Sequence, residues 1–390
     1  MTTLLLLVTV TSLLIPAYVY AGYPCALWLL TLGRTGPNHR VWETRPAVAL
    51  VISCYNEADV IRDKLENALE LDYPRDKLSI VVVSDGSDDG TDDIVREYAL
   101  VGVKLIRQEG RLGKTMGLNL AMEQLSSDIT VFSDANAMYS PDAIRKLVRN
   151  FADEQVGYVV GAALYTDGDS GASAHNENLY WRYELAIKAM ESRLHSVVGG
   201  DGAIYAIRSH LWEPLQQKDI NDFVNPLQII ARGYRGIFDP EARCYEETAG
   251  DFSREIARKE RIVNRSIRGL MRVKSVMNPF RVGLFAWEVV SHKLLRWLIP
   301  LFLLVGAIGS LLLALAGYGV FQLIAAGVLL VLLLAGAGHL ASDRNALPLF
   351  ISVPYYFVMV NLYSLRGIVK ALRGETQVIW SSARPGRERD

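Results

Sequence analysis

The sequence predicts an α/β domain built on a mostly parallel sheet, with membrane helices before and after it. Two observations lead to this fold class. Charged residues make up 21% of the 390-residue chain, yet residues 1–33, 298–342 and 345–365 contain no Asp, Glu, Lys or Arg. Between the first two of these stretches, short β-branched runs alternate with helix-like segments. A bilayer-spanning helix needs about 20 mostly apolar residues, so we expect the ends to lie in a membrane and the middle outside it.

Residues 1–33 are predicted to form an N-terminal transmembrane anchor. The alternative is a cleaved signal peptide, because Val19-Tyr20-Ala21 could serve as a small-residue cleavage site. No basic segment precedes the apolar run, which continues to Leu32, and this favours the anchor. Several basic residues follow at once. By the positive-inside tendency they place the soluble domain in the cytoplasm, and we expect a multi-pass protein of the cell (inner or plasma) membrane.

The α/β pattern occupies residues 46–248. Near-continuous apolar runs at 47–53, 78–84 and 128–133 are typical of strands buried on both faces, and 101–107 is a weaker member of the set. Helix-like segments lie between and after them, at 57–69, 92–98, 114–125 and 141–151. This alternation predicts parallel strands joined by right-handed crossovers. Ligands bind beyond the carboxyl ends of such strands.

The loops at those carboxyl ends are polar, at residues 53–57, 84–91, 111–115 and 133–137. Together they offer carboxylates, an aromatic ring and basic side chains, a combination suited to a nucleotide diphosphate with Mg²⁺ or Mn²⁺. A plainer interpretation exists for the second loop, whose Asp, Ser and Gly residues could form only a turn and a helix cap. The third loop is not a P-loop, because Gly110 lies three residues before Gly113 rather than five.

Residues 249–297 are predicted to form amphipathic interface helices. Eight basic residues fall between 254 and 274, and apolar residues recur there at helical intervals. A helix of this kind lies at a membrane surface and is attracted by anionic lipid. The alternative is a solvated helix held by ion pairs, but only Asp251, Glu255 and Glu260 oppose the eight cations.

C-terminal transmembrane helices are predicted over residues 298–370, followed by a basic cytoplasmic tail at 371–390. Two helices should meet near Gly317, and small residues would allow close helix contact at Gly306, Gly309, Gly327, Gly336 and Gly338. Residues 347–365 are a weaker third candidate, broken by Pro354. Three passes from a cytoplasmic domain would put the basic C-terminus outside, against the positive-inside tendency. Either the last segment is re-entrant or interfacial, or the orientation rule fails.

Taken together, these motifs resemble the family 2 glycosyltransferases, in particular membrane-embedded hyaluronan, chitin, cellulose and bacterial poly-N-acetylglucosamine synthases. The resemblance covers the whole chain and implies a Rossmann-like GT-A catalytic domain with transmembrane and interface helices. It implies that the donor is bound by Tyr55, Glu57, Asp85, Lys114 and Asp134. Asp134 matches the first aspartate of the metal-coordinating DxD motif, and Asn136 stands at the second position.

The same resemblance implies an acceptor loop and a catalytic base. The glycine-rich segment 199–203 matches the acceptor loop and includes Gly200 and Asp201. Asp222 stands in place of the family's ED motif as the implied base; the plainer alternative is an ordinary helix N-cap. Trp181 belongs to an aromatic cluster that either lines the acceptor groove or packs in the core.

A further motif bears on processive synthesis. The segment 258–262 falls where processive members carry QxxRW; it keeps Arg261 but has Arg258 for Gln and Ile262 for Trp. The resemblance implies that Arg258 and Arg261 bind the donor diphosphate.

The implied chemistry is an inverting sugar transfer from a UDP-sugar. A divalent cation would stabilise the charge on the departing diphosphate, and a carboxylate base would take the acceptor's proton. The product is expected to be a polysaccharide that the enzyme builds or extends. The altered QxxRW keeps an alternative open, namely transfer of one sugar to a polyprenyl phosphate or glycerolipid. Expected partners are the UDP-sugar, a glycan or lipid acceptor, and membrane lipids.

Charge and composition weigh against other classes. The 41 Lys and Arg against 42 Asp and Glu give a net charge of −1, which argues against a cationic nucleic-acid binder. Three scattered cysteines are too few for a disulfide framework or a zinc site. A receptor or transporter with a nucleotide-binding domain is a weaker alternative, because the apolar stretches lack the ionisable residues of most transport pathways.

Overall fold

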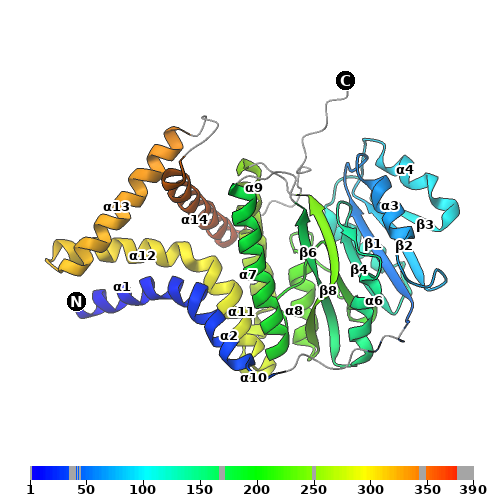
Figure 1. The fold of residues 1–390 in the computed structure, drawn as a ribbon, viewed down its shortest axis with the longest axis horizontal. Coiled ribbons are helices and arrows are strands. Elements are labelled where there is room, and N and C mark those ends of the chain that lie inside the picture. The colour runs from blue at the N-terminus through cyan, green and yellow to red at the C-terminus, as the bar shows by residue number, and fades with distance from the viewer. Residues whose placement is uncertain are drawn as a thin grey trace. The chain divides into compact units, whose positions relative to one another are not determined.

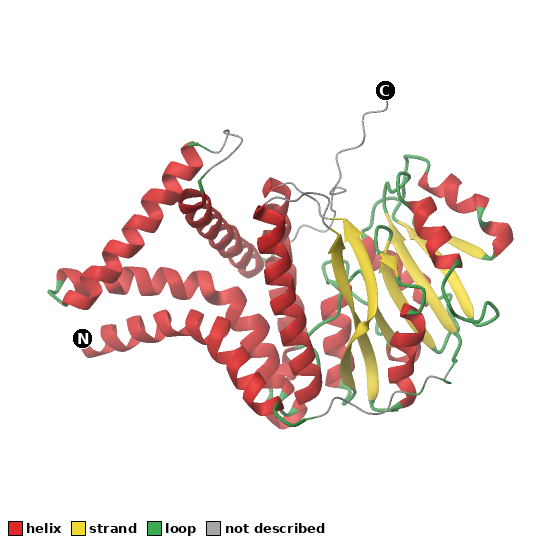
Figure 2. Ribbon diagram, in the orientation of Figure 1, coloured by secondary structure: helices red, strands yellow, loops and turns green. Residues whose placement is uncertain are grey.

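The computed structural model describes residues 2–34, 41, 43, 45–166, 172–247, 252–341 and 348–375 (Figure 1). These residues form two compact units. The helical unit comprises residues 2–26, 252–267 and 290–375. The sheet unit comprises the described residues from 27 to 247 together with 268–289. All strands belong to the sheet unit, as Figure 2 shows by colour.

The sheet unit is built on eight strands in the order β3-β2-β1-β4-β7-β6-β8-β5. The strands are β1 (Val48–Cys54), β2 (Leu78–Ser84), β3 (Val103–Arg107), β4 (Ile129–Asp134), β5 (Met138–Tyr139), β6 (Val156–Thr166), β7 (Tyr205–Arg208) and β8 (Arg235–Glu247). The first four strands are parallel, with Leu50 paired to Ile80 on one side and Val131 on the other. This confirms the predicted parallel α/β half. The other half is mixed, because β7 runs antiparallel to both β4 and β6.

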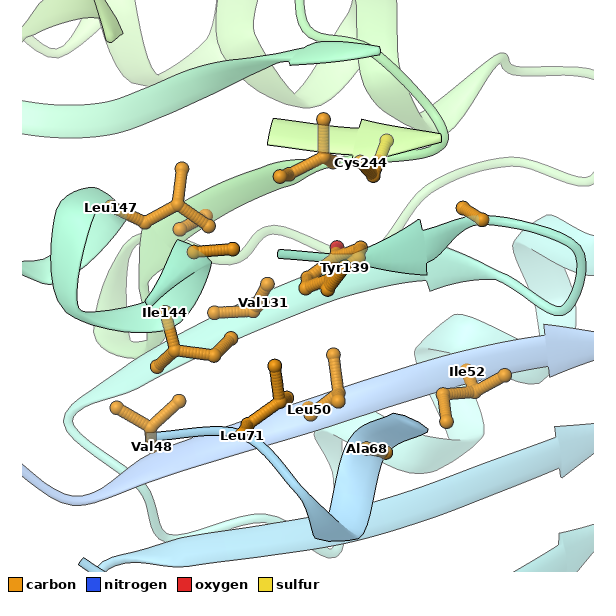
Figure 3. Packing of buried hydrophobic residues seen from close by; sticks show 14 of the residues in the cluster. Val48, Leu50, Ile52, Ala68, Leu71, Val131, Tyr139, Ile144, Leu147 and Cys244 are labelled. Atoms are coloured by element: carbon orange, nitrogen blue, oxygen red, sulfur yellow. The ribbon is translucent and has the colours of Figure 1, made fainter. Parts of the chain in front are cut away.

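Helices cover this sheet and close its core. They are α3 (Ile61–Leu69), α4 (Thr91–Glu97), α5 (Lys114–Met122), α6 (Ala143–Val148), α7 (Ala172–Leu194) and α8 (Asn221–Ala231). The short helices α10 (Pro279–Val282) and α11 (Phe285–Val289) also belong to the sheet unit. Every residue of β1 is buried, as its continuous apolar run predicts. Figure 3 shows Leu50 and Val131 from the sheet lying near Ala68 of α3 and Ile144 of α6. Burial of these aliphatic side chains fixes the strand ends that carry the polar loops.

The helical unit begins with α1 (Thr2–Ala17), which continues through a π-helical turn (Tyr18–Gly22) into α2 (Tyr23–Thr31). It also contains most of α9 (Phe252–Arg272), with α12 (Leu295–Leu315), α13 (Gly319–Leu340) and α14 (Leu349–Arg373). Within the described residues, three helical stretches are long and apolar enough to cross a membrane: Thr2–Thr31, Phe285–Leu315 and Gly319–Leu340. The predicted junction near Gly317 is confirmed, since it lies between α12 and α13.

Small residues bring some of these helices into close contact. A Cβ atom added at Gly306 would lie 2.8 Å from the side chain of Leu13, and one at Gly309 would overlap Thr9. The Tyr18 hydroxyl lies 2.8 Å from Ser291 Oγ, within hydrogen-bonding distance. The first helix is thus packed along α12. Gly338 likewise meets Tyr355 of α14, whereas nothing lies within 4 Å of a Cβ at Gly327 or Gly336.

The predicted break at Pro354 is wrong. Pro354 lies inside α14, which runs unbroken from Leu349 to Arg373. A proline removes one helical hydrogen bond, but packing of the neighbouring turns can offset that loss. Here Tyr355 packs against Gly338 of α13.

Candidate active site

The candidate site lies at the carboxyl ends of the central parallel strands. From β1 the chain passes to β2 and β3 on one side, and then returns to β4 on the other side of β1. Open α/β sheets bind ligands in a crevice at such a reversal of strand order, and here that position falls between the loops that follow β1 and β4. The polar loops singled out from the sequence follow β1, β2, β3 and β4.

The loops after β1 and β2 are fastened to each other by hydrogen bonds. The Asn56 side chain donates to Asp88 Oδ1 at 2.8 Å and accepts from the Asp88 backbone N–H at 3.0 Å. The Glu57 N–H donates to Thr91 Oγ1 at 2.9 Å. Asn56 has a φ of +53°, a left-handed conformation that asparagine tolerates better than most residues. These hydrogen bonds fix the backbone on either side of Asn56. They therefore also fix the backbone of Tyr55 and Glu57, which are predicted to bind the donor.

Tyr55 is stacked against the basic loop that follows β3. The Arg111 guanidinium lies 3.7 Å from the centre of the Tyr55 ring, a close cation–π contact. The contact joins two loops that the sequence identified separately. It presents a rigid aromatic and cationic surface at the crevice.

Asp85 is a buried carboxylate whose two oxygens have different surroundings. Its Oδ1 accepts from the N–H groups of Leu112 and Gly113 at 2.9 and 2.8 Å, and from Gln108 Nε2 at 2.8 Å. Its Oδ2 is buried and has no hydrogen-bond partner among the described residues. Burial raises the pKa of Asp85, although these backbone N–H groups oppose the rise. A fixed acceptor oxygen is thus left for a ligand's N–H or O–H group.

Three charged groups meet around Gly202 of the glycine-rich loop. A Cβ atom at this glycine would lie 3.5 Å from each of Asp134 Oδ2, Asp222 Oδ2 and Lys114 Nζ. The three come from the end of β4, the first turn of α8 and the start of α5. The structure therefore brings together the predicted metal ligand, the predicted base and the basic loop around a residue with no side chain.

Electrostatics couple these groups. Lys114 forms an ion pair with Asp134. Burial lowers the pKa of Lys114, but Asp134 and Asp222 outweigh it, so the net pKa is raised and the lysine stays charged. Burial also raises the pKa of Asp222, with Asp201 and Asp134 adding to the rise and Lys114 opposing it. The carboxylate of Asp222 has no hydrogen bond or ion pair with another described residue, so it is available to accept a proton.

Asp222 is not the N-cap of its helix. The N-cap position of α8 belongs to Ile220, and Asp222 is the second helical residue. The glycine loop packs directly on this turn, because the Gly200 N–H donates to the Asp222 carbonyl oxygen at 2.5 Å. A Cβ atom at Gly200 would lie 2.9 Å from the same oxygen. Glycine at this position therefore lets the loop approach α8 and sets Gly202 beside the carboxylate.

The predicted acceptor residues Asp201 and Trp181 are joined through a lysine that sequence reasoning missed. Lys188 Nζ lies 3.0 Å from Asp201 Oδ2 and 5.3 Å from the centre of the Trp181 ring. The Trp181 indole N–H donates to the Ala163 carbonyl oxygen, and its ring packs against the hydrophobic core. Core packing therefore explains part of the reason for a tryptophan at position 181. The role of Trp181 in binding an acceptor stays a prediction.

A second missed lysine supports the turn that follows Asp134. Lys64 of α3 is fully buried, donates to the Ala137 carbonyl oxygen, and lies 4.1 Å from the centre of the Tyr139 ring. Asn67 exchanges two hydrogen bonds with the Tyr139 backbone, at 2.9 and 2.8 Å. Burial lowers the pKa of Lys64 to about 7. The sequence could have indicated that Lys64 is buried, because helical spacing places it on the same face as the apolar residues Ile61, Leu65 and Ala68.

The donor set at the end of β4 fits a hard divalent cation that shares its coordination with phosphate. Mg²⁺ and Mn²⁺ prefer oxygen ligands, and Mg²⁺ often takes only one or two protein carboxylates together with substrate phosphates and water. Asp134 offers a carboxylate that is 38% exposed, and Asn136 lies two residues further in the turn. Among the described residues, no group of three or more His, Cys, Asp and Glu side chains could hold a metal alone.

The two arginines predicted to bind the diphosphate lie on α9, in the helical unit. The side chain of Arg258 lies outside the described residues. The roles of Arg258 and Arg261 stay predictions.

Comparison with known proteins identifies the sheet unit's relatives. Residues 49–211 match the family model "Glycosyl transferase family 2". The poly-beta-1,6-N-acetyl-D-glucosamine synthase of Staphylococcus aureus strain MSSA476 is 34% identical over 207 residues, covering 51% of this chain and 49% of the relative. The Staphylococcus epidermidis synthase is 29% identical over 116 residues, covering 29% of this chain and 28% of the relative. The chain thus spans about half the length of the curated relatives it matches.

One solved structure is similar along almost the whole chain. The mannosyltransferase PcManGT from Pyrobaculum calidifontis, solved with GDP-Man and Mn²⁺, covers 94% of this chain and 99% of its own, with a TM-score of 0.68 and 24% identity. At this identity the likeness establishes the fold alone, and it confirms the predicted GT-A architecture with accompanying apolar helices.

Proposed function

Because the chain carries a glycosyltransferase family 2 domain, we propose that it transfers a sugar from a nucleotide-sugar donor, with inversion, onto a growing polysaccharide. The observation that carries this proposal is the convergence of Lys114, Asp134 and Asp222 around Gly202. One cation and two carboxylates at a point with no side chain suit a reaction that develops charge on a diphosphate and moves a proton from a hydroxyl.

The crevice between the loops is proposed to bind the nucleotide, with UDP as its donor nucleotide. The unpartnered Oδ2 of Asp85 would accept a hydrogen bond from the base or ribose. Tyr55, held by Arg111, would provide a face for the base to stack on. Glu57 belongs to the same hydrogen-bonded loop and would contact the ribose.

The diphosphate would lie beside Lys114 and Asp134. Lys114 stays protonated and attracts the negative charge that grows on the leaving phosphate. Asp134, with Asn136, would hold Mg²⁺ or Mn²⁺; such an ion supplies further stabilisation of that charge when it is bound. The PcManGT structure supports a divalent cation by analogy of fold, since it was solved with Mn²⁺.

Asp222 is proposed as the general base. The acceptor hydroxyl oxygen bonds to the anomeric carbon while the bond from that carbon to the phosphate oxygen breaks, and the nucleoside diphosphate leaves with the electron pair. The hydroxyl proton passes to Asp222, whose raised pKa makes it a better base than an ordinary aspartate. A single displacement of this kind inverts the anomeric centre and requires no covalent intermediate.

A polysaccharide product is favoured by the synthases to which the chain is similar. Transfer of one sugar to a lipid, such as a polyprenyl phosphate or a glycerolipid, is the second candidate. It is favoured by Arg258 and Ile262, which replace the Gln and Trp of the processive QxxRW motif. The three candidate spans support a multi-pass protein of the cell membrane, and the basic residues after the first span support a cytoplasmic catalytic domain.

Turnover with purified protein tests these proposals. Detergent-solubilised protein would be supplied with a panel of UDP- and GDP-sugars and Mg²⁺ or Mn²⁺, and both nucleotide release and product size would be measured. We expect release with one UDP-sugar and a long carbohydrate product. Release with a GDP-sugar would overturn the donor assignment, and a single-sugar lipid product would support the second candidate. We expect Asp222→Asn to lose most of this release, because it removes the proposed base.

A further inference from the structure

The last helix among the described residues, α14, has contacts that bear on how it relates to the membrane. Three stretches of the described residues qualify as spans, and the catalytic domain lies between the first and the second. The second and third spans follow each other through a three-residue connection at 316–318. The chain therefore crosses away from the catalytic side through α12 and returns to it through α13. The first turn of α12 and the last turn of α13 must lie at the same membrane face.

The C-terminal part of α14 packs at that face. Ile368 and Leu365 of α14 share a hydrophobic cluster with Trp297 and Leu298, which belong to the first turn of α12. Val263 and Ile267 of α9 complete this cluster.

Close backbone contact strengthens the attachment of α14 to α9. A Cβ atom at Gly367 would lie 2.7 Å from the Glu260 carbonyl oxygen, so only glycine allows this approach. Asn264 Nδ2 donates to the carbonyl oxygens of Gly367 and Glu375, at 3.3 and 2.9 Å. Lys370 forms an ion pair with Glu260 at 2.5 Å.

The N-terminal part of α14 packs at the same face, against the end of α13. A Cβ atom at Gly338 would lie 2.7 Å from the Tyr355 side chain, and the rings of His339 and Tyr355 are 6.2 Å apart. Gly338 and His339 are among the last three residues of α13. In Figure 1, α14 begins beside the end of α13 and then leads away from it.

We propose that α14 is an interfacial helix that lies on the lipid surface at the catalytic side, and that it does not span the membrane. A span would separate its two ends by the roughly 30 Å hydrocarbon core, yet both ends contact elements at one face. The helix has 25 residues and a length of about 37 Å, so it must run along that face. This proposal does not depend on which sugar or acceptor the enzyme uses.

The side chains of α14 suit a lipid surface. Its N-terminal half exposes large apolar residues, including Phe350 (66%) and Val353 (57%). Its C-terminal turns carry Arg366, Lys370 and Arg373, and all three are exposed. Apolar side chains would enter the headgroup boundary while the cations contact lipid phosphates. The arrangement also resolves the charge conflict raised by three C-terminal passes, because the basic C-terminus then follows the positive-inside tendency.

Cysteine labelling in sealed membrane vesicles tests the side on which α14 ends. In a Cys25→Ser background, Glu375→Cys would be compared with two markers: Leu100→Cys, on the catalytic domain and 99% exposed, and Tyr318→Cys, between α12 and α13. Cys54 and Cys244 are buried and can be retained. With a membrane-impermeant maleimide, we expect Glu375→Cys to react in the same vesicle orientation as Leu100→Cys. Reaction together with Tyr318→Cys would overturn the proposal.

Depth measurements test the orientation of the helix independently of its ends. A fluorescent probe attached at Phe350→Cys, Phe357→Cys or Val369→Cys would be quenched in nanodiscs by lipids carrying a spin label either near the headgroup or deep in the chain. An interfacial helix predicts stronger quenching by the shallow label at all three positions. Strongest deep quenching at Phe357→Cys, in the middle of α14, would show a spanning helix and overturn the proposal. Neither measurement requires activity, so both remain decisive if the donor assignment fails.

Discussion

Two carboxylates in the sheet unit, Asp85 and Asp222, share a raised pKa but differ in what surrounds them. Burial is the main cause of the rise for both. Asp85 Oδ1 accepts three hydrogen bonds from the loop before α5, which hold the carboxylate in one orientation. Asp222 has no comparable hydrogen bonds from the described residues and instead faces Lys114, Asp134 and Asp201.

The difference indicates that the two carboxylates have different roles in the site. A carboxylate held by N–H donors is stabilised in its ionised form and presents a fixed acceptor, which suits recognition of a ligand. A carboxylate surrounded by other charges, without hydrogen bonds to satisfy it, has a stronger tendency to take up a proton, which suits a general base. The predictions below separate these two roles, because one should alter binding and the other turnover.

Asp222→Asn should give the largest effect on turnover. The amide cannot accept the acceptor's proton, and general-base catalysis typically contributes 10²–10⁴-fold, so we expect kcat to fall by about 10³-fold. Donor binding should hardly change, because the substitution keeps the shape of the side chain. Nucleotide-release rates and calorimetric titration with UDP would measure the two quantities. Full turnover in this variant would show that Asp222 is not the base.

Asp134→Ala should reduce turnover by about 10²–10³-fold, the range for loss of one preorganised electrostatic group. Unlike Asp222→Asn, it should also weaken metal-dependent nucleotide binding, since it removes the carboxylate at the end of β4 and the partner of Lys114. Titration with UDP in the presence and absence of Mn²⁺ would test this. An unchanged Mn²⁺ dependence would exclude Asp134 as the metal ligand. Asp142→Ala is a matched control, since it removes another aspartate paired with a lysine, Lys146.

Asp85→Asn should affect binding more than catalysis. The amide can keep its oxygen at the Oδ1 position, where it still accepts the three loop hydrogen bonds, but it turns the unpartnered Oδ2 position into a donor. A ligand N–H or O–H at that position would lose its acceptor at a cost of about 1–3 kcal/mol, or roughly 5- to 150-fold in donor KM. We expect kcat to change little. A fall in kcat with unchanged KM would contradict the division of roles between Asp85 and Asp222.

Much of the parallel half of the sheet unit, strands β1 to β4 with their loops, could be predicted from the sequence. The reason is that each predicted site residue there lies close in sequence to the strand that carries it. Each buried apolar strand is followed directly by its polar loop, as with β4 and Asp134, so strand and site residue are read from one segment. The parallel arrangement then places the loops at a common edge.

The contacts that could not be predicted join residues far apart in the chain. Lys64 reaches the carbonyl of Ala137, and Asp85 is held by the backbone of residues 112 and 113. The antiparallel insertion of β7 between β4 and β6 is also absent from the local pattern, because a short apolar run such as 204–208 does not reveal its strand direction. Similarly, the sequence left α14 unassigned, since its relation to the membrane depends on contacts of Gly367 and Gly338 with other helices.

The smallest predicted effect concerns pH. If Asp222 is the base, it must be ionised to accept a proton, so activity should rise with pH through the pKa of Asp222. That pKa lies above the ordinary value of 3.8, because burial and the charges of Asp201 and Asp134 disfavour ionisation more than Lys114 favours it. The acid limb of the kcat profile should therefore lie at a higher pH than the pKa of an exposed aspartate.

Asp201→Asn removes one of the charges that raise the pKa of Asp222, so it should shift this limb to lower pH. Asp85→Asn should leave the limb in place. A limb that disappears in Asp85→Asn and does not move in Asp201→Asn would reverse the assignment, making the hydrogen-bonded carboxylate the titrating base.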